Sequence, residues 1–248
     1  MTKHLKYKAL AVLCGALLLA ITGVVCARRA HAAPPAGESS ITGTVKLNGT
    51  PPRQKPIDMS KEPSCAAIHA SKPVTTENVI AGPSGGLANV VVYISQGWSG
   101  PAVVNPQPAQ IDQKGCQYLP HVVALDAGEH MKVVNSDQTS HNIHPQPTKN
   151  SEWNKSQPPG SPPFDVTWNN EEIAIPVKCN IHPWMHGYIA VVKGPYGVSD
   201  TNGSFTIPNV PPGNYTLTAW QETYGAQTQQ VTVSAGKAAT ASFAYTAK

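Results

Sequence analysis

The sequence predicts an all-β protein, and three observations support this fold class. Short segments of alternating apolar and polar residues recur along the 248-residue chain, as half-buried strands do. Proline (24 residues) and glycine (20 residues) are spread over the whole length and separate these segments, as turn residues do. Only 13% of the residues are charged, and no pattern indicates an amphipathic helix of ordinary length. Coiled coils and long-helix proteins are therefore excluded.

The first 32 residues have the layout of a secretory signal peptide. Residues 1–8 are polar and basic, Ala9 to Ala27 is an uncharged apolar run, and Ala30-His31-Ala32 offers small residues to a signal peptidase. We expect cleavage after Ala32, with Ala27 as the second choice, and a periplasmic or secreted protein. An uncleaved membrane anchor is the alternative, because the run is long enough to span a bilayer.

The basic character of the chain lies in this leader. Five of the 18 Lys and Arg residues precede residue 30, whereas all 14 acidic residues follow residue 32. Removing residues 1–32 leaves 13 basic against 14 acidic residues, a net charge of −1. No cluster of basic residues then remains to bind nucleic acid, and nucleic acid is not expected as a partner.

Three cysteines follow the leader, which itself contains Cys14 and Cys26. The residue before Cys26 is not small, which argues against lipid attachment. An odd number of cysteines in an oxidising compartment needs an explanation. We expect a Cys65–Cys116 disulfide and a thiol with a special role at Cys179, although another pairing, or three ordinary cysteines, stays open.

The first predicted strand follows a Pro/Ala/Gly/Ser-rich linker at residues 33–40. Ile41 to Leu47 alternates apolar and polar residues, and residues 87–94 form a β-branched run that is the best candidate for a central strand. Residues 50–87 are rich in Pro, Ser and Gly and predict a long loop. Residues 97–108, with three prolines, predict a boundary.

Short strands with turn residues between them continue to the end of the chain. The predicted strands are residues 122–124, 129–135, 164–168, 173–177, 188–193, 204–207, 214–220, 228–234 and 239–245. Residues 145–163 predict an exposed loop. Turns are expected at Asp126 to Gly128, Asp200 to Gly203 and Pro211 to Asn214. Such spacing is typical of β-sandwiches.

One loop carries metal-binding chemistry. Cys179-Asn-Ile-His182-Pro-Trp-Met185 follows a predicted strand and places a thiolate, an imidazole and a thioether close together. These are the ligand types of a blue-copper site. The fourth ligand must come from elsewhere, and His141, after the predicted strand 129–135, is the candidate. We expect one copper ion held by His141, Cys179, His182 and Met185.

Residues 109–193 resemble a cupredoxin, a type 1 blue copper protein of the amicyanin/plastocyanin-like kind. The loop at 179–185 is similar to the family's ligand loop. His141-Asn142-Ile143-His144 is similar to its upstream His element, with the first His as ligand, and Tyr118-Leu-Pro120 is similar to an aromatic-x-Pro near its start. The resemblance covers about a third of the chain. It implies a Greek-key β-sandwich that carries single electrons.

Two other histidines are alternative metal ligands. His144 lies three residues beyond His141, and a strand would turn the two to opposite faces. His186 directly follows Met185 and could replace it.

Four residues also have plainer interpretations. His121 and His130 are expected to be structural or solvent-facing, and Cys179 alone could be a buried thiol. Trp184 is either a packing residue or a surface aromatic at the point where electrons leave the imidazole; both readings stay open.

The end of the chain resembles a carboxypeptidase regulatory-like domain, a small prealbumin-like β-sandwich. Residues 199–207 and 210–217 carry this resemblance. The early strands of such a domain are similar to Gly43-Thr-Val45 and Ala88 to Ile94.

We therefore predict a discontinuous β-sandwich of residues 40–99 and 195–248, into which the cupredoxin-like residues 109–193 are inserted. Two or three domains in series are the alternative.

The sequence thus predicts an exported copper protein that is a one-electron carrier and not an enzyme. No Ser/His/Asp arrangement, phosphate-binding glycine loop or persuasive carboxylate pair is found, and no catalytic residues are assigned. The partners would be redox proteins, unidentified, with a membrane involved only if the leader is uncleaved. The alternative is copper storage or delivery, or a module that binds carbohydrate or protein and has a non-redox metal site. Zinc would compete where copper is scarce.

Overall fold

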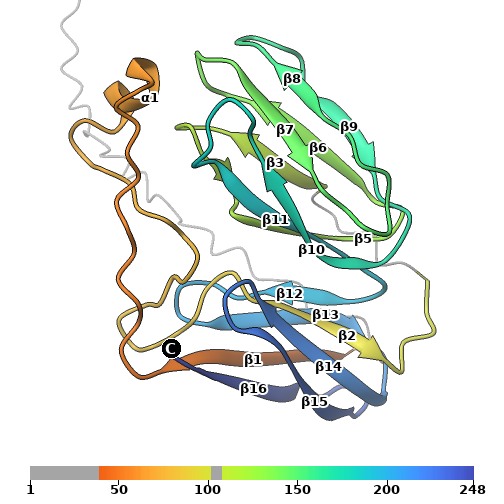
Figure 1. Ribbon diagram of the computed structural model, residues 1–248. Helices are drawn as coiled ribbons and strands as arrows, with labels where there is room; N and C mark the ends of the chain where they lie inside the picture. The colour runs from red at the N-terminus through yellow and green to blue at the C-terminus, as the bar shows by residue number, and fades with distance from the viewer. Residues whose placement is uncertain (1–38, 102–107) are drawn as a thin grey trace, which may run out of the picture. The chain divides into compact units, whose positions relative to one another are not determined.

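The computed structural model describes residues 39–101 and 108–248; the expected leader, residues 1–32, lies outside them. The described residues form sixteen strands and one short helix (Figure 1), which confirms the all-β prediction. The elements are β1 (Ser39–Asn48), α1 (Pro63–Ile68), β2 (Val91–Gln96), β3 (Ala109–Gln113), β4 (Tyr118–Leu119), β5 (Val122–Asp126), β6 (His130–Asn135), β7 (His141–Pro145), β8 (Lys155–Gln157), β9 (Phe164–Thr167), β10 (Glu172–Lys178), β11 (His186–Val192), β12 (Tyr196–Val198), β13 (Ser204–Val210), β14 (Gly213–Gln221), β15 (Gly225–Val233) and β16 (Ala239–Thr246). None of the described helical residues form a segment long and apolar enough to cross a membrane.

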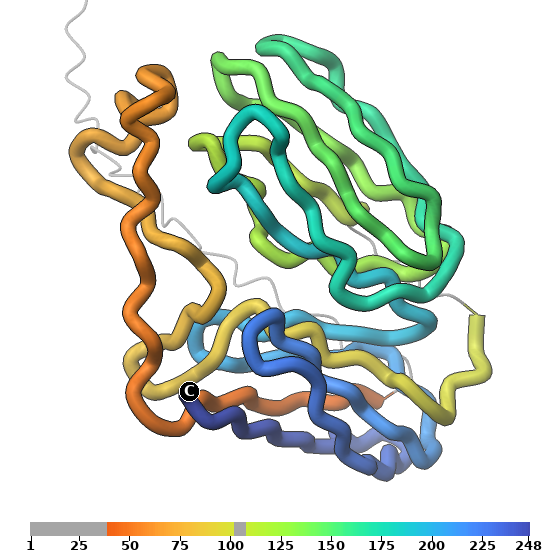
Figure 2. The backbone as a smooth tube through the Cα atoms, viewed as in Figure 1, coloured from red at the N-terminus to blue at the C-terminus, as the bar shows by residue number. Residues whose placement is uncertain are grey.

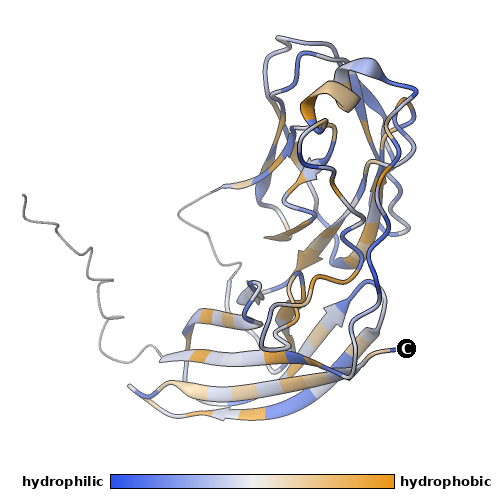
Figure 3. Ribbon diagram, turned by 90° about the vertical axis from the view of Figure 1, so that its left-hand side faces the viewer, coloured by the Kyte–Doolittle hydropathy of each residue, from blue (hydrophilic) through white to orange (hydrophobic). Residues whose placement is uncertain are grey.

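Strands from both ends of the described chain form the first two sheets. Their orders are β13-β1-β16 and β12-β2-β14-β15. β1 pairs antiparallel with β13 and parallel with β16, and β2 is a central strand between β12 and β14. Inward-facing residues such as Ile41, Leu87 and Leu217, all fully buried, form one core. Figure 3 shows the alternation of hydrophobic and hydrophilic residues along these strands.

Strands β3 to β11 form two further sheets. Their orders are β5-β11-β10-β7-β8 and β4-β3-β6-β9. Their core includes the fully buried Leu125, Met131 and Ile143, together with Cys65, Cys116 and Cys179. Burial of each large apolar side chain stabilises the fold by about 1.5–3 kcal/mol. The predicted domain boundaries (40–99 with 195–248, and 109–193) stay a prediction.

The segment between β1 and β2 is mostly irregular, as predicted, and Figure 2 traces its path. It contains α1, which the sequence analysis missed because six residues are too few to show a helical period. Pro63 lies in the first turn of α1, where its missing N–H has no cost. The helix buries Cys65, which forms the predicted disulfide with Cys116 (Cα–Cα 5.8 Å).

Several strand boundaries differ from the prediction. β2 begins at Val91 rather than at residue 87, because Asn89 has a left-handed backbone (φ 60°) that no extended strand allows. β8 lies inside the predicted loop 145–163, and β3 was not predicted. β8 is polar throughout, and in β3 the alternation is confined to Ala109 to Asp112, which is too short to predict a strand. Their pairing with β7 and β6 could therefore not be seen locally.

The turn predicted at Asp200 to Gly203 connects β12 to β13. The N–H of Gly203 donates to the carbonyl of Asp200 at 2.9 Å, and Asp200 Oδ1 accepts from the N–H groups of Asn202 and Ser204. Gly203 has φ 77°, and a Cβ there would lie 2.1 Å from the carbonyl oxygen of Val45. Glycine is therefore required at this position.

Glu172, the first residue of β10, anchors the loop that follows β7. Its carboxylate accepts hydrogen bonds from the backbone N–H groups of Thr148, Lys149 and Asn150. Burial opposes ionisation, but these hydrogen bonds and those from the Thr148 and Asn150 side chains outweigh it and lower the pKa of Glu172.

We expect Glu172→Gln to lower the free energy of unfolding by about 1–3 kcal/mol at pH 7, because the amide is a weaker acceptor and its NH₂ faces donors. A carboxyl with a lowered folded pKa stabilises above its unfolded pKa of about 4.3, and this contribution is lost as the pH falls through the folded value. Urea unfolding should therefore show the difference between the two proteins shrinking below pH 4. A difference that persists unchanged at pH 3 would contradict this account.

Candidate metal centre

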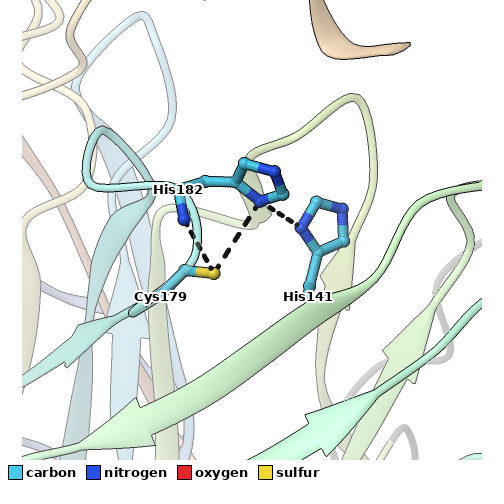
Figure 4. A group of neighbouring side chains, drawn as sticks. All are labelled: His141, Cys179 and His182. Carbon is cyan, nitrogen blue, oxygen red and sulfur yellow. Dashed lines mark hydrogen bonds between the residues drawn. The ribbon is translucent and has the colours of Figure 1, made fainter. Parts of the chain in front are cut away.

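Three of the four predicted ligands converge in the structure. His141 begins β7, Cys179 directly follows β10, and His182 lies in the loop between β10 and β11. One donor atom from each lies within 4.8 Å of the others. Figure 4 shows the two imidazoles and the thiol pointing toward one another. All three side chains are buried, with His141 fully enclosed.

The two histidines face each other through the same ring atom. His141 Nδ1 lies 2.9 Å from His182 Nδ1, and His182 Nδ1 lies 3.8 Å from Cys179 Sγ. The Nε2–H of His141 donates to Asp137 Oδ2 at 2.8 Å, which assigns the lone pair of a neutral ring to Nδ1. Two facing lone pairs repel unless a proton or a cation lies between them. The donor set therefore fits a metal ion that accepts two imidazoles and a thiolate.

Asp137 holds His141 and the disulfide region together. Its two carboxylate oxygens accept hydrogen bonds from the backbone N–H groups of Gly115 and Cys116, each at 2.7 Å. Burial opposes the charge of Asp137, but the hydrogen bonds from His141 and these N–H groups lower its pKa. A carboxylate on the far nitrogen of a ligand histidine fixes the ring and raises its basicity.

The sequence analysis missed Asp137. The sequence shows an acidic residue four positions before His141. Outside a helix, however, a spacing of four does not predict that two side chains meet.

Asn142 positions the thiol. Asn142 Oδ1 accepts hydrogen bonds from the N–H of Asn180 at 2.7 Å and from the thiol of Cys179 at 3.3 Å. The N–H of His182 points at Cys179 Sγ from 3.4 Å. Burial works against a thiolate, but hydrogen bonds with His141 and with nearby backbone groups lower the pKa of Cys179. The site therefore favours the ionised sulfur that binds metals.

The pKa values of the two imidazoles are shifted in opposite directions. Burial opposes the cation of His141, but Asp137 and Cys179 outweigh burial and raise its pKa. Burial, together with the nearby charge of His141, lowers the pKa of His182. In the absence of metal, a proton on His141 can therefore neutralise the Cys179 thiolate.

Met185 closes the loop that bears Cys179 and His182. Its N–H donates to the carbonyl of His182 at 2.9 Å, and its carbonyl accepts from the N–H of Cys179 at 3.1 Å. The side chain is buried in the same core as Cys179. Its role as an axial ligand stays a prediction.

The disulfide and α1 lie against the far side of His182. His182 Nε2 is 3.9 Å from Cys65 Sγ and 3.8 Å from a carboxylate oxygen of Glu62, the residue before α1. Trp184 packs on the same imidazole (ring centroids 5.1 Å apart) and donates its Nε1–H to the carbonyl of Cys116 at 3.1 Å. This hydrogen bond fits the packing interpretation of Trp184.

The two alternative ligands lie outside this group. The ring nitrogens of His144 contact Asn180 (3.2 Å) and Glu152 (2.6 Å). His186 groups with His121 and Glu222 instead.

We expect Asp137→Asn to weaken metal binding at this site about 10–100-fold, the usual effect of removing an outer carboxylate from a ligand histidine. The variant loses the negative charge that makes His141 basic, while its side chain keeps its size. Competition against a chelator of known affinity measures the change. Asp165→Asn, a change of the same kind at an exposed β9 position, is the matched control and should leave the affinity unchanged. Equal affinities for the Asp137 variant and the unaltered protein would exclude this role.

Comparison with protein families gives a match near the end of the chain. The family described as polysaccharide lyase family 4, domain II, matches residues 196–241. A putative rhamnogalacturonase of Neurospora crassa is 51% identical over 45 residues, which is 18% of this chain and 8% of that protein. The chain thus spans a small part of the curated relative that it matches.

The solved structures to which the chain is similar include cupredoxins. Amicyanin from Paracoccus versutus is 19% identical (TM-score 0.31), with 41% of this chain and 97% of that chain covered. A purple cupredoxin from Nitrosopumilus maritimus is 21% identical (TM-score 0.29), with 34% and 99% covered. A copper-containing nitrite reductase from Thermus scotoductus SA-01 is 19% identical (TM-score 0.32), with 39% and 25% covered.

Proposed function

We propose that this protein binds one copper ion in a mononuclear type 1 site and carries single electrons outside the cytoplasm. The observation that carries the proposal is the meeting of two imidazole nitrogens and a cysteine sulfur within 4.8 Å in a buried site. This is the His₂Cys set of blue-copper electron-transfer proteins. The copper would supply the redox change between Cu(I) and Cu(II).

Each residue has a distinct part in this proposal. The Cys179 thiolate, favoured by hydrogen bonds with His141 and backbone groups, would be the soft ligand, and the Nδ1 atoms of His141 and His182 would complete the set of donors. Met185 would offer its thioether as a further, weaker ligand and would so tune the potential. Asp137 holds His141 in position, and Asn142 fixes the backbone next to Cys179 by accepting a hydrogen bond from the N–H of Asn180. Because these side chains are already fixed by hydrogen bonds, little rearrangement accompanies a change of charge at the site.

The remaining features of the proposal follow from the chain as a whole. The disulfide between Cys65 and Cys116 is typical of exported proteins and supports the export that the sequence of residues 1–32 predicts. The partner is a redox protein, and nucleic acid is not a partner. The protein moves electrons and does not make or break covalent bonds in a substrate.

Addition of Cu(II) to the purified protein tests this function. A type 1 site gives an intense blue or green colour from thiolate charge transfer, and voltammetry of the loaded protein then shows a reversible one-electron wave. A pale Cu(II) complex would favour copper storage or delivery. Absence of copper binding would remove the copper function altogether.

Carbohydrate binding is a second candidate, and one observation favours it. Residues 196–241 match a polysaccharide lyase domain, and the curated relative is named a rhamnogalacturonase. These residues include β12 to β15 and the start of β16. Sedimentation of the protein with insoluble pectic polysaccharide tests this function. Retention in the supernatant at all polysaccharide concentrations would exclude it.

A further inference from the structure

A second group of metal-binding side chains lies apart from the Cys179 site. His121 precedes β5, His186 begins β11, and Glu222 directly follows β14. Donor atoms of the three lie within 4.8 Å of one another. The side chains of His121 and Glu222 are only 4% and 3% exposed, and the rings of His121 and His186 meet edge to face at 5.3 Å.

Two atoms of this group lack the partners that buried polar atoms need. Glu222 Oε1 and His186 Nε2 are buried and make no hydrogen bond. An unpaired carboxylate oxygen and an unpaired imidazole nitrogen are each unfavourable in a buried site. Because both are electron-pair donors, one cation can satisfy both.

The other ring nitrogens are oriented as they are in metal-bound histidines. The Nδ1–H of His186 donates to the carbonyl of Trp184 at 3.0 Å, which leaves the lone pair on Nε2. His121 Nδ1 faces a carboxylate oxygen of Glu77 at 3.8 Å, while its Nε2 lies 2.7 Å from Glu222 Oε2. A carbonyl or carboxylate behind each ring is the usual outer support of a zinc-bound histidine.

We propose that His121, His186 and Glu222 form a second metal site, for a borderline divalent ion such as Zn²⁺. Two imidazoles and one carboxylate, with water in the fourth position, are an established zinc ligand set. Ligand atoms of a tetrahedral zinc site lie about 3.3 Å apart. Binding therefore widens the 2.7 Å contact between His121 and Glu222 and releases to solvent any proton that they share.

Space for one water molecule lies beside the two imidazoles of this group. A cavity of about 10 Å³ is lined by Glu77, His121 and His186 among others, which is the size of one water. Glu77 is 29% exposed and gives this cavity a carboxylate at the solvent side.

A metal ion bound by His121, His186 and Glu222 would also stabilise the loop that carries Cys179 and His182. His186 is the residue after Met185, so an ion bound there fixes the end of the loop that carries Cys179 and His182. The ion would also link β11, through His186, to the segment after β14, through Glu222. These two residues are 36 positions apart in the sequence. The ion would thus stabilise the fold around the first site without being part of it.

Zinc titration of the metal-free, full-length mature protein by calorimetry tests the proposal. We expect two tight zinc ions per chain, because zinc also fits the Cys179 site. Glu222→Gln should bind one, with a loss of at least 100-fold at the second site, and so should His186→Gln. Cys179→Ser should also bind one tight ion, and Cys179→Ser with Glu222→Gln should bind none. His130→Gln, at an exposed β6 position, is the matched control and should bind two.

The outcomes separate this site from the proposed copper site. One tight ion in the unaltered protein that disappears in Cys179→Ser but persists in Glu222→Gln would overturn the second site and leave the first. One tight ion that disappears in Glu222→Gln but persists in Cys179→Ser would support the second site and count against the first. No tight ion at all would overturn the second site, and His121–Glu222 would be a plain ion pair. Near-ultraviolet circular dichroism checks folding; if Glu222→Gln is unfolded, His186→Gln decides.

Discussion

Cys179→Ser is expected to abolish the intense visible absorption of the copper-loaded protein and to weaken copper binding by more than 100-fold. The colour arises from charge transfer between the thiolate sulfur and Cu(II), and the serine hydroxyl cannot replace it. The affinity should fall further than the 10–100-fold that the loss of an outer partner costs, because Cys179 is the one free cysteine among the described residues. Absorption during Cu(II) titration, with chelator competition for affinity, measures both effects.

His144→Gln is the matched control for this experiment. His144 lies on β7, as His141 does, but its nitrogens contact Glu152 and Asn180 rather than the other ligand candidates. Its replacement should leave the absorption band and the copper affinity unchanged. A band that survives in Cys179→Ser would remove Cys179 from the ligand set, and a band lost in His144→Gln would place His144 in it.

Removal of the disulfide should have the largest effect on stability. Cys65 and Cys116 are 51 residues apart in sequence, and closing a loop of this size lowers the entropy of the unfolded chain by the equivalent of about 4 kcal/mol. We expect the double variant Cys65→Ala, Cys116→Ala to lose about 2–5 kcal/mol of unfolding free energy. Urea unfolding monitored by tryptophan fluorescence measures the loss.

The same variant tests whether the disulfide supports the metal site. Cys116 donates its N–H to Asp137, and Cys65 lies beside His182, so copper affinity should fall together with stability. The unaltered protein, after reduction with dithiothreitol and removal of the reductant under argon, is the comparison without any substitution. A loss below 1 kcal/mol in both proteins would show that the native packing holds α1 in place without the covalent link.

Strands with a long alternation of apolar and polar residues were predicted from the sequence, and the short or polar strands β3 and β8 were missed. β1, β13 and β14 each contain buried positions at alternate residues, so their period was visible locally. β8 is polar and β3 has only two apolar residues, so both are strands chiefly because neighbouring strands pair with them. Asn89, with its left-handed backbone, shortened the strand that its β-branched neighbours predicted. These features depend on tertiary pairing, which no local pattern records.

The residues of the candidate metal centre also fall into two groups, those that a short segment of sequence could predict and those that it could not. Cys179 and His182 are three residues apart on one loop, so their meeting could be predicted from spacing, and the His141 element marked the third side chain. Asp137 could not be assigned, because its role depends on the N–H groups of residues 115 and 116, which lie 22 and 21 residues before it in the sequence. The grouping of His121 with Glu222 spans 101 residues and left no trace in any short segment.

The pairing of Cys65 with Cys116 also implies an order of assembly. On the proposed export route, Cys65, Cys116 and Cys179 would reach an oxidising compartment as thiols, and each thiol is a ligand for soft metal ions. Oxidation of Cys65 and Cys116 removes two of these thiols as possible ligands and leaves the Cys179 sulfur for the proposed ion. It also fixes the part of the chain in which the N–H of Cys116 donates to Asp137. Maturation should therefore proceed from export to oxidative folding and then to metallation, and copper supplied before the oxidation step would meet three rival thiols in an unfinished chain.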